Sequence, residues 1–159
     1  MSDGLLRKVQ SIQNAAARLV TGARRCDHIM SVLRQLHWLP VRQRVEYKVA
    51  CLVHQSLAGQ TPAYIADDTQ LVTDGDRRQL RSVAARTCLV PRTHNNFRDR
   101  SFGAAGPRMW NSLPSHLRRD MNFAHFTRQL KTFLFVSQPR RIVTVCLFCT
   151  LEILLLIFT

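Results

Sequence analysis

The sequence predicts a mainly α-helical fold: a small helical domain with at most a short β element and an apolar C-terminal helix. Apolar residues recur at helical spacing in several stretches, and glycine or proline stands at the ends of those stretches. Only one short run has the character of a strand. The chain has 159 residues, of which 46% are hydrophobic and 21% charged, so it can bury the core of about one domain.

The first helix is expected over residues 4–21, within a helical segment that covers residues 1–60. Ser2 or Asp3 can cap its start, and Gly22 can end it. Small alanines fill the space between the large apolar residues, and the basic residues lie off the apolar face. That face consists of Leu5, Leu6, Val9, Ile12, Leu19 and Val20.

Two further helices are expected in the same segment. Asp27 can cap a short helix over 28–37, which must stop before Pro40 because proline has no backbone donor. Pro40 suits the first position of a third helix over 40–58. Gly59 can end this helix.

Residues 61–100 are predicted to be a turn-rich connector. The stretch "TPAYIADD" (61–68) predicts one helical turn that packs Tyr64 and Ile65, and "TCLVPR" (87–92) predicts a short strand. The residues between these two stretches are polar and show no clear period, which is typical of a loop.

Residues 101–137 are predicted to form a Trp-centred turn followed by an amphipathic helix. Gly106-Pro107 and Leu113-Pro114 are turn signals, with one turn of helix at 107–112 between them. Asp120 or Asn122 can cap the helix, which is expected over 122–136. The residues to which this interpretation gives a structural role are Trp38, Trp110, Pro107 and Pro114.

A core position is the preferred interpretation of both tryptophans, because a buried indole contributes about 150–250 Å² of contact area. The alternative is that Trp38 or Trp110 stacks on nucleic-acid bases with help from Arg108 and Arg118.

Residues 138–159 form a basic junction and an apolar tail. The tail, residues 142–159, carries one charge, Glu152. As a helix it would extend about 27 Å, slightly less than a hydrocarbon core of about 30 Å. It is therefore either a membrane anchor with Arg140 and Arg141 on the cytoplasmic side, or a segment never selected as protein. Glu152 disfavours the anchor.

The charge of the chain favours a polyanionic partner. The net charge is +13, and 20 of the 23 cationic side chains are arginine, which binds phosphate in a bidentate manner. RNA or DNA is the first expectation and an anionic membrane the second, although a GC-rich coding sequence also raises arginine content. The candidate nucleic-acid-binding residues are Arg7, Arg18, Arg24, Arg25, Arg42, Arg44, Arg108 and Arg118.

No catalytic residue, metal ligand or cofactor is predicted. In "YIADD" the aspartates Asp67 and Asp68 stand one residue too far from the tyrosine for the Tyr-x-Asp-Asp metal turn of reverse transcriptases, and no β-hairpin pattern flanks them. The pair Cys146 and Cys149 lacks the two further ligands of a zinc site. Cys51 and His54 lie one helical turn apart, as two metal ligands could, but they are interpreted as one packed residue and one surface residue.

The start of the chain, "MSDGLLRKVQ", has no apolar region of the kind found in signal peptides. The chain has five cysteines, and this odd number does not fit a framework of paired disulfides. These features favour free thiols in a reducing compartment, nuclear or cytoplasmic, with the membrane as the alternative.

Several motifs together resemble a known family. They are "QNAAARLVTGARRCDHI", "LHWLPVRQR", "TPAYIADD", "LVPRT", "GPRMWNSLP" and "FTRQLKTFLF", in this order over residues 5–135. They are similar to the C-terminal region of the open reading frame of non-LTR retrotransposons of the jockey and CR1 type, the RNA-directed DNA polymerase from mobile element jockey. "LHWLPVRQR" and "GPRMWNSLP" are specific as a pair.

The resemblance implies that the chain is a C-terminal fragment of a reverse transcriptase, without the catalytic palm and the endonuclease. No catalytic residue carries over, and the fragment is expected to bind nucleic acid with little sequence preference. The alternatives are a small basic tail-anchored membrane protein and a non-functional remnant of a mobile element.

Overall fold

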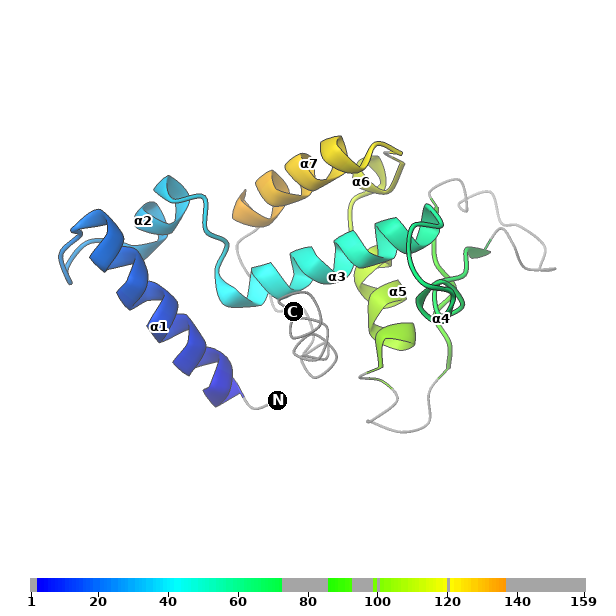
Figure 1. Cartoon of the computed structure of the whole chain (residues 1–159), viewed down its shortest axis with the longest axis horizontal. Helices are drawn as coiled ribbons and strands as arrows, with labels where there is room; N and C mark the ends of the chain where they lie inside the picture. Colours follow the sequence, from blue (N-terminus) through cyan, green and yellow to red (C-terminus); the bar gives the residue numbers. More distant parts are fainter. Residues whose placement is uncertain (1–2, 73–85, 93–98, 100, 120, 137–159) are drawn as a thin grey trace.

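The computed structural model describes residues 3–72, 86–92, 99, 101–119 and 121–136, and within these ranges the chain is mainly α-helical, as predicted (Figure 1). α3 runs through the centre, with α7 on one side and α5 on another, while α1 and α2 form a pair at one end. The helices are α1 (Asp3–Thr21), α2 (Ile29–Gln35), α3 (Val41–Leu57), α4 (Ala63–Ala66), α5 (Phe102–Ser112), α6 (Ser115–Arg119) and α7 (Phe123–Val136).

α1 has the predicted length, but its apolar face is largely turned away from the protein. Gly22 ends the helix with a φ of +68°, a conformation that glycine adopts without strain. The buried residues of α1 are Leu6 and Ala17, whereas Ile12 and Leu19 are 68% and 86% exposed. The helix therefore packs through a side that is less apolar than its outer face.

Two glutamines of α1 hold the start of α3. The N–H of Val41 donates to Oε1 of Gln10 at 2.8 Å, and Nε2 of Gln13 donates to the carbonyl of Leu39 at 2.8 Å. Pro40 is the N-cap residue of α3 and not its first helical residue, which corrects the prediction. Because the side chain of proline has no acceptor, Gln10 satisfies the first free N–H of α3 from another helix.

The start of α2 also differs from the prediction. The N-cap residue is His28, and no side chain caps the helix. Oδ2 of Asp27 instead accepts the N–H of Arg24 at 2.6 Å, so this carboxylate closes the turn before α2.

A strained residue follows α2, which ends at Gln35 and not at residue 37 as predicted. His37 has a φ of +55° and lies in the left-handed region, where the carbonyls of Leu33 and Arg34 accept the N–H groups of Trp38 and His37. This is the helix ending that normally places glycine at the left-handed position.

We expect the variant His37→Gly to raise the free energy of unfolding by about 1 kcal/mol, because glycine removes the steric cost of the left-handed conformation. Urea denaturation of the full chain measures this difference. His37→Ala is the matched control, since alanine retains the Cβ that causes the strain. An equal gain in both variants would contradict the explanation.

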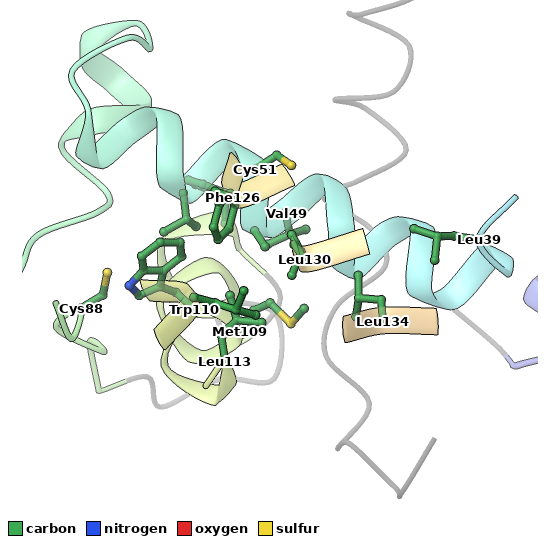
Figure 2. Packing of buried hydrophobic residues seen from close by; sticks show 14 residues of the cluster. Leu39, Val49, Cys51, Cys88, Met109, Trp110, Leu113, Phe126, Leu130 and Leu134 are labelled. Atoms are coloured by element: carbon green, nitrogen blue, oxygen red, sulfur yellow. The ribbon is translucent and has the colours of Figure 1, made fainter. Parts of the chain in front are cut away.

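The main core lies between α3, α5 and α7 (Figure 2). Leu39, Val49, Phe126, Leu130 and Leu134 follow the length of α3 and α7, and Trp110 of α5 closes the cluster at one end. A smaller cluster joins α1 and α2 around Leu33 and includes the partly buried Trp38. Each cluster excludes water from the apolar sides of amphipathic helices, which stabilises them in the fold.

α5 is much longer than the single turn expected at 107–112. Gly106 and Pro107 lie inside this helix and are buried, so the interpretation of this pair as a turn signal is wrong. A Cβ at Gly106 would lie 3.1 Å from Cγ2 of Val53 on α3, so glycine at this position permits the close approach of the two helices.

Pro114 does mark a turn, because α5 ends with Leu113 in an extended conformation and α6 follows directly. The carbonyl of Pro114 accepts the N–H groups of Leu117 and Arg118. α7 is capped as predicted by Asn122, whose Oδ1 accepts the N–H groups of Ala124 and His125.

The predicted connector contains a single β-bridge and no strand among the residues that the structure describes. Leu71 and Cys88 form this bridge. The side chain of Asn111 on α5 binds the backbone N–H and carbonyl of Cys88. Its Oδ1 accepts the Cys88 N–H at 2.9 Å, and its Nδ2 donates to the Cys88 carbonyl at 2.8 Å. Ile65 packs against the core as expected, but Tyr64 is 71% exposed, which corrects the prediction for this residue.

Candidate nucleic-acid interface

Three of the eight candidate arginines line one groove. Arg7, Arg18 and Arg25 surround an open groove of about 800 Å³ that runs along α1 and the turn after it. Among the residues that the structure describes, no acidic one lines this groove. The remaining lining residues are Gln10, Ser11, Asn14, Ala15, Leu19, Gly22 and Ala23.

The polar part of the groove follows one stripe of α1. Arg7, Ser11, Asn14 and Arg18 are spaced by four, three and four residues, which places them on the same side of a helix. The two arginines are separated by 11 residues, or about 16 Å along the axis. Arg7 and Arg18 are among the residues predicted from the sequence, whereas Ser11 and Asn14 are not, although their helical spacing is a signal in the sequence.

The arginines of the groove carry no ion pair among the described residues. Nε of Arg18 is buried and has no hydrogen-bond partner there. Their charges are therefore available to an anion from outside the protein, which distinguishes them from other candidate arginines.

Arg42 and Arg108 are partly neutralised by aspartates. Nη2 of Arg42 lies 2.8 Å from Oδ1 of Asp3, and Nη2 of Arg108 lies 2.7 Å from Oδ1 of Asp99. Burial raises the pKa of the Glu46 carboxyl, and the nearby Arg42 opposes this shift, so Arg42 has a second acidic neighbour. The structure does not bring these two arginines to the groove.

The remaining three candidates also lie outside the groove lining. Nη1 of Arg118 donates to Oγ1 of Thr87 at 3.1 Å and so supports the connector. Arg24 and Arg44 are exposed. The eight candidate residues therefore divide into one shared site of three and five dispersed positions.

The two tryptophans differ in burial, which decides whether either could stack on a base. Trp110 is fully buried, and its Nε1 donates to the carbonyl of Arg86 at 2.7 Å. Its indole ring therefore has no face open to a base. Trp38 is partly buried against the small cluster of α1 and α2.

The two aspartates of "YIADD" lie where α4 ends. Asp67 is the C-cap residue of α4, and both carboxylates are exposed beside an open pocket of about 350 Å³. A Cβ built on Gly103 would lie 3.0 Å from Oδ1 of Asp68, so this carboxylate sits against the first turn of α5. There it interacts favourably with the positive end of the helix dipole.

Cys51 and His54 of α3 both face the core, so the surface position expected for one of them is wrong. His54 is 3% exposed and stacks on Phe126, with ring centroids 4.5 Å apart. Burial raises the pKa of the Cys51 thiol to about 11, so this thiol is protonated at neutral pH and is a poor metal ligand. Within the described ranges, no group of three or more histidine, cysteine or acidic residues could hold a metal ion.

The tail at 142–159 and the cysteine pair in it lie outside the described residues. Among the helices that are described, none is both long and apolar enough to span a bilayer. No protein-family model, curated protein or solved structure is significantly similar to the chain.

Proposed function

We propose that the chain is the C-terminal part of a non-LTR retrotransposon RNA-directed DNA polymerase and that it binds RNA or DNA through the groove on α1. The order of its sequence motifs supports the origin. Arg7, Arg18 and Arg25 surround one groove and have no ion pair within the described ranges, which supports the binding. The proposal assigns no polymerase or nuclease chemistry to this chain.

The groove suits a polyanion because its cationic groups have no acidic neighbour in the lining. Each arginine that contacts a phosphate releases condensed counterions, which favours binding at low salt. Contacts of this kind position a nucleic acid without reading its sequence. We therefore infer sequence-tolerant binding that salt weakens strongly.

The triple variant Arg7→Ala/Arg18→Ala/Arg25→Ala tests this proposal. Three lost phosphate contacts should reduce the slope of log affinity against log salt by about 2 for single strands and up to about 3 for duplex DNA. Fluorescence anisotropy of the full chain with labelled RNA and DNA, titrated at several salt concentrations, measures the slope.

The matched control is Arg44→Ala/Arg119→Ala/Arg128→Ala, which removes the same charge from exposed positions outside the groove. The control should retain most of the slope. Equal losses in both variants would show that binding depends on total charge and not on the groove. Absence of salt-dependent binding in the unmodified chain would contradict the proposed function itself.

A further inference from the structure

The outer face of α1 is the largest group of exposed apolar residues that the structure describes. Five of the nine large hydrophobic residues found exposed in the described ranges lie on this one helix. We define the apolar stripe as Leu5, Val9, Ile12, Leu19 and Val20, which are 46%, 45%, 68%, 86% and 65% exposed.

The members of the stripe share one side of the helix. Leu5, Val9, Ile12 and Leu19, with the small Ala16 between the last two, are spaced by four, three, four and three residues, which is the repeat of a helix–helix seam. From Leu5 to Val20 the stripe extends about 22 Å along the axis. Leu6 and Ala17, the residues buried against the rest of the protein, belong to the neighbouring side.

A continuous apolar surface of this kind normally has a partner. The chain itself contains a second apolar element, residues 142–159, in which Glu152 is the only charged residue. Eighteen residues in helical conformation extend about 27 Å, which is enough to cover a stripe of about 22 Å.

The described end of the chain lies close to the α1–α2 pair. The carbonyl of Phe135, near the end of α7, accepts a hydrogen bond from Nη2 of Arg34 on α2 at 3.3 Å. α2 in turn packs against α1. Five residues, 137–141, separate α7 from the apolar segment and can span about 17 Å.

We propose that residues 142–159 pack along the apolar stripe of α1 within the same molecule. Lys8 lies beside the stripe, three residues after Leu5 and four before Ile12, and it offers Glu152, the single acidic side chain of the segment, an opposite charge. A short tether gives the segment an effective concentration on the order of millimolar at the stripe. The groove with Arg7 and Arg18 stays open, because both lie off the stripe.

Two other occupants fit less well. A second copy of the chain would bring a net charge of +13 against another of the same sign. One helical stripe also offers less than the roughly 800 Å² per partner that stable dimers bury. A lipid bilayer would have to take up the carboxylate of Glu152, whereas the side of α1 offers it Lys8.

Disulfide crosslinking of the full chain tests the proposal. In a Cys26→Ser background, which removes the exposed native thiol of the described region, Ile12→Cys places a thiol at the middle of the stripe. We expect oxidation with dithiodipyridine at low protein concentration to join it to Cys146 or Cys149 within a monomer, because disulfides require Cα atoms about 4.4–6.8 Å apart. Peptide mass mapping identifies the bond.

The control is Met121→Cys, a position 74% exposed and outside the stripe. It should give at least tenfold less of the same crosslink.

Crosslinks that form only between chains would assign the stripe to a second copy. Absence of a crosslink, or equal yield from both positions, would also overturn the proposal. The same reaction with phosphatidylcholine–phosphatidylserine vesicles tests the bilayer: retention of the chain by vesicles without any crosslink in solution would assign the tail to the membrane.

Discussion

Replacing Trp110 with alanine is expected to lower the free energy of unfolding by about 3–5 kcal/mol. Trp110 is the largest fully buried side chain, and it closes the core between α3, α5 and α7 (Figure 2). The truncation leaves a cavity in the core and removes the hydrogen bond from Nε1 to the carbonyl of Arg86. A domain of this size has about 5–15 kcal/mol in total, so the loss is a large part of its stability.

The aromatic neighbours of Trp110 add to this effect. The ring of Phe126 has its centroid 5.7 Å from that of Trp110, and the ring of His54 lies 6.1 Å away in an edge-on arrangement. Such pairs contribute about 0.5–1.5 kcal/mol beyond the buried area. The three rings come from three different helices, so the alanine variant weakens contacts between α3, α5 and α7 together.

Urea denaturation followed by circular dichroism measures the loss. Trp110→Phe is the control, because it keeps most of the apolar volume and loses only the indole donor and part of the ring. We expect its cost to be less than half that of alanine. A Trp110→Ala variant with an unchanged midpoint would contradict the core role, and weaker nucleic-acid binding by that stable variant would instead support base stacking.

The sequence was sufficient for the helices whose apolar pattern is continuous. α3 and α7 have uninterrupted helical periods, and Gly59 and Asn122 stand at their ends as local signals. These signals act within a few residues, so they can be recognised without knowledge of the fold. The side of α1 that packs could not be predicted, because Gln10 and Gln13 bind the start of α3 across the structure.

The candidate site was predictable only in part for a similar reason. Arg7 and Arg18 share one side of a helix, and this follows from their spacing. The pairing of Arg42 with Asp3 joins positions 39 residues apart, and such a contact has no local signal. The sequence therefore indicated which residue type suits a polyanion, but not which arginines form ion pairs with aspartates.

α5 shows the same limit most clearly. Glycine and proline are local turn signals in sequence, and "GP" at 106–107 satisfies that rule. In the structure the pair lies within a helix, and the missing Cβ of Gly106 lets that helix approach α3. The nearest atom to a Cβ at this position belongs to Val53, which is more than fifty residues earlier in the chain, so no local signal reveals the contact.

The variant Gly106→Leu is therefore expected to lower the free energy of unfolding by about 3 kcal/mol, at the upper end of the cost of overpacking. The added Cβ alone would lie 3.1 Å from Cγ2 of Val53 and 3.2 Å from Cε2 of Phe102, and the rest of the side chain would have to push α5 away from α3. The main core depends on this helix pair, so its neighbours cannot relax without losing contacts. Urea denaturation measures the change.

A double-mutant cycle identifies the cause of that loss. Val53→Ala removes Cγ2, the nearest atom to the new Cβ, so Gly106→Leu should cost at least 1 kcal/mol less in the Val53→Ala background than alone. Gly106→Ala completes the series. The helix propensity of alanine, about 1 kcal/mol better than that of glycine, raises the free energy of unfolding, whereas the tight contact of the single added Cβ lowers it. Additive losses in the cycle would show that Gly106 is required for another reason than its distance from Val53.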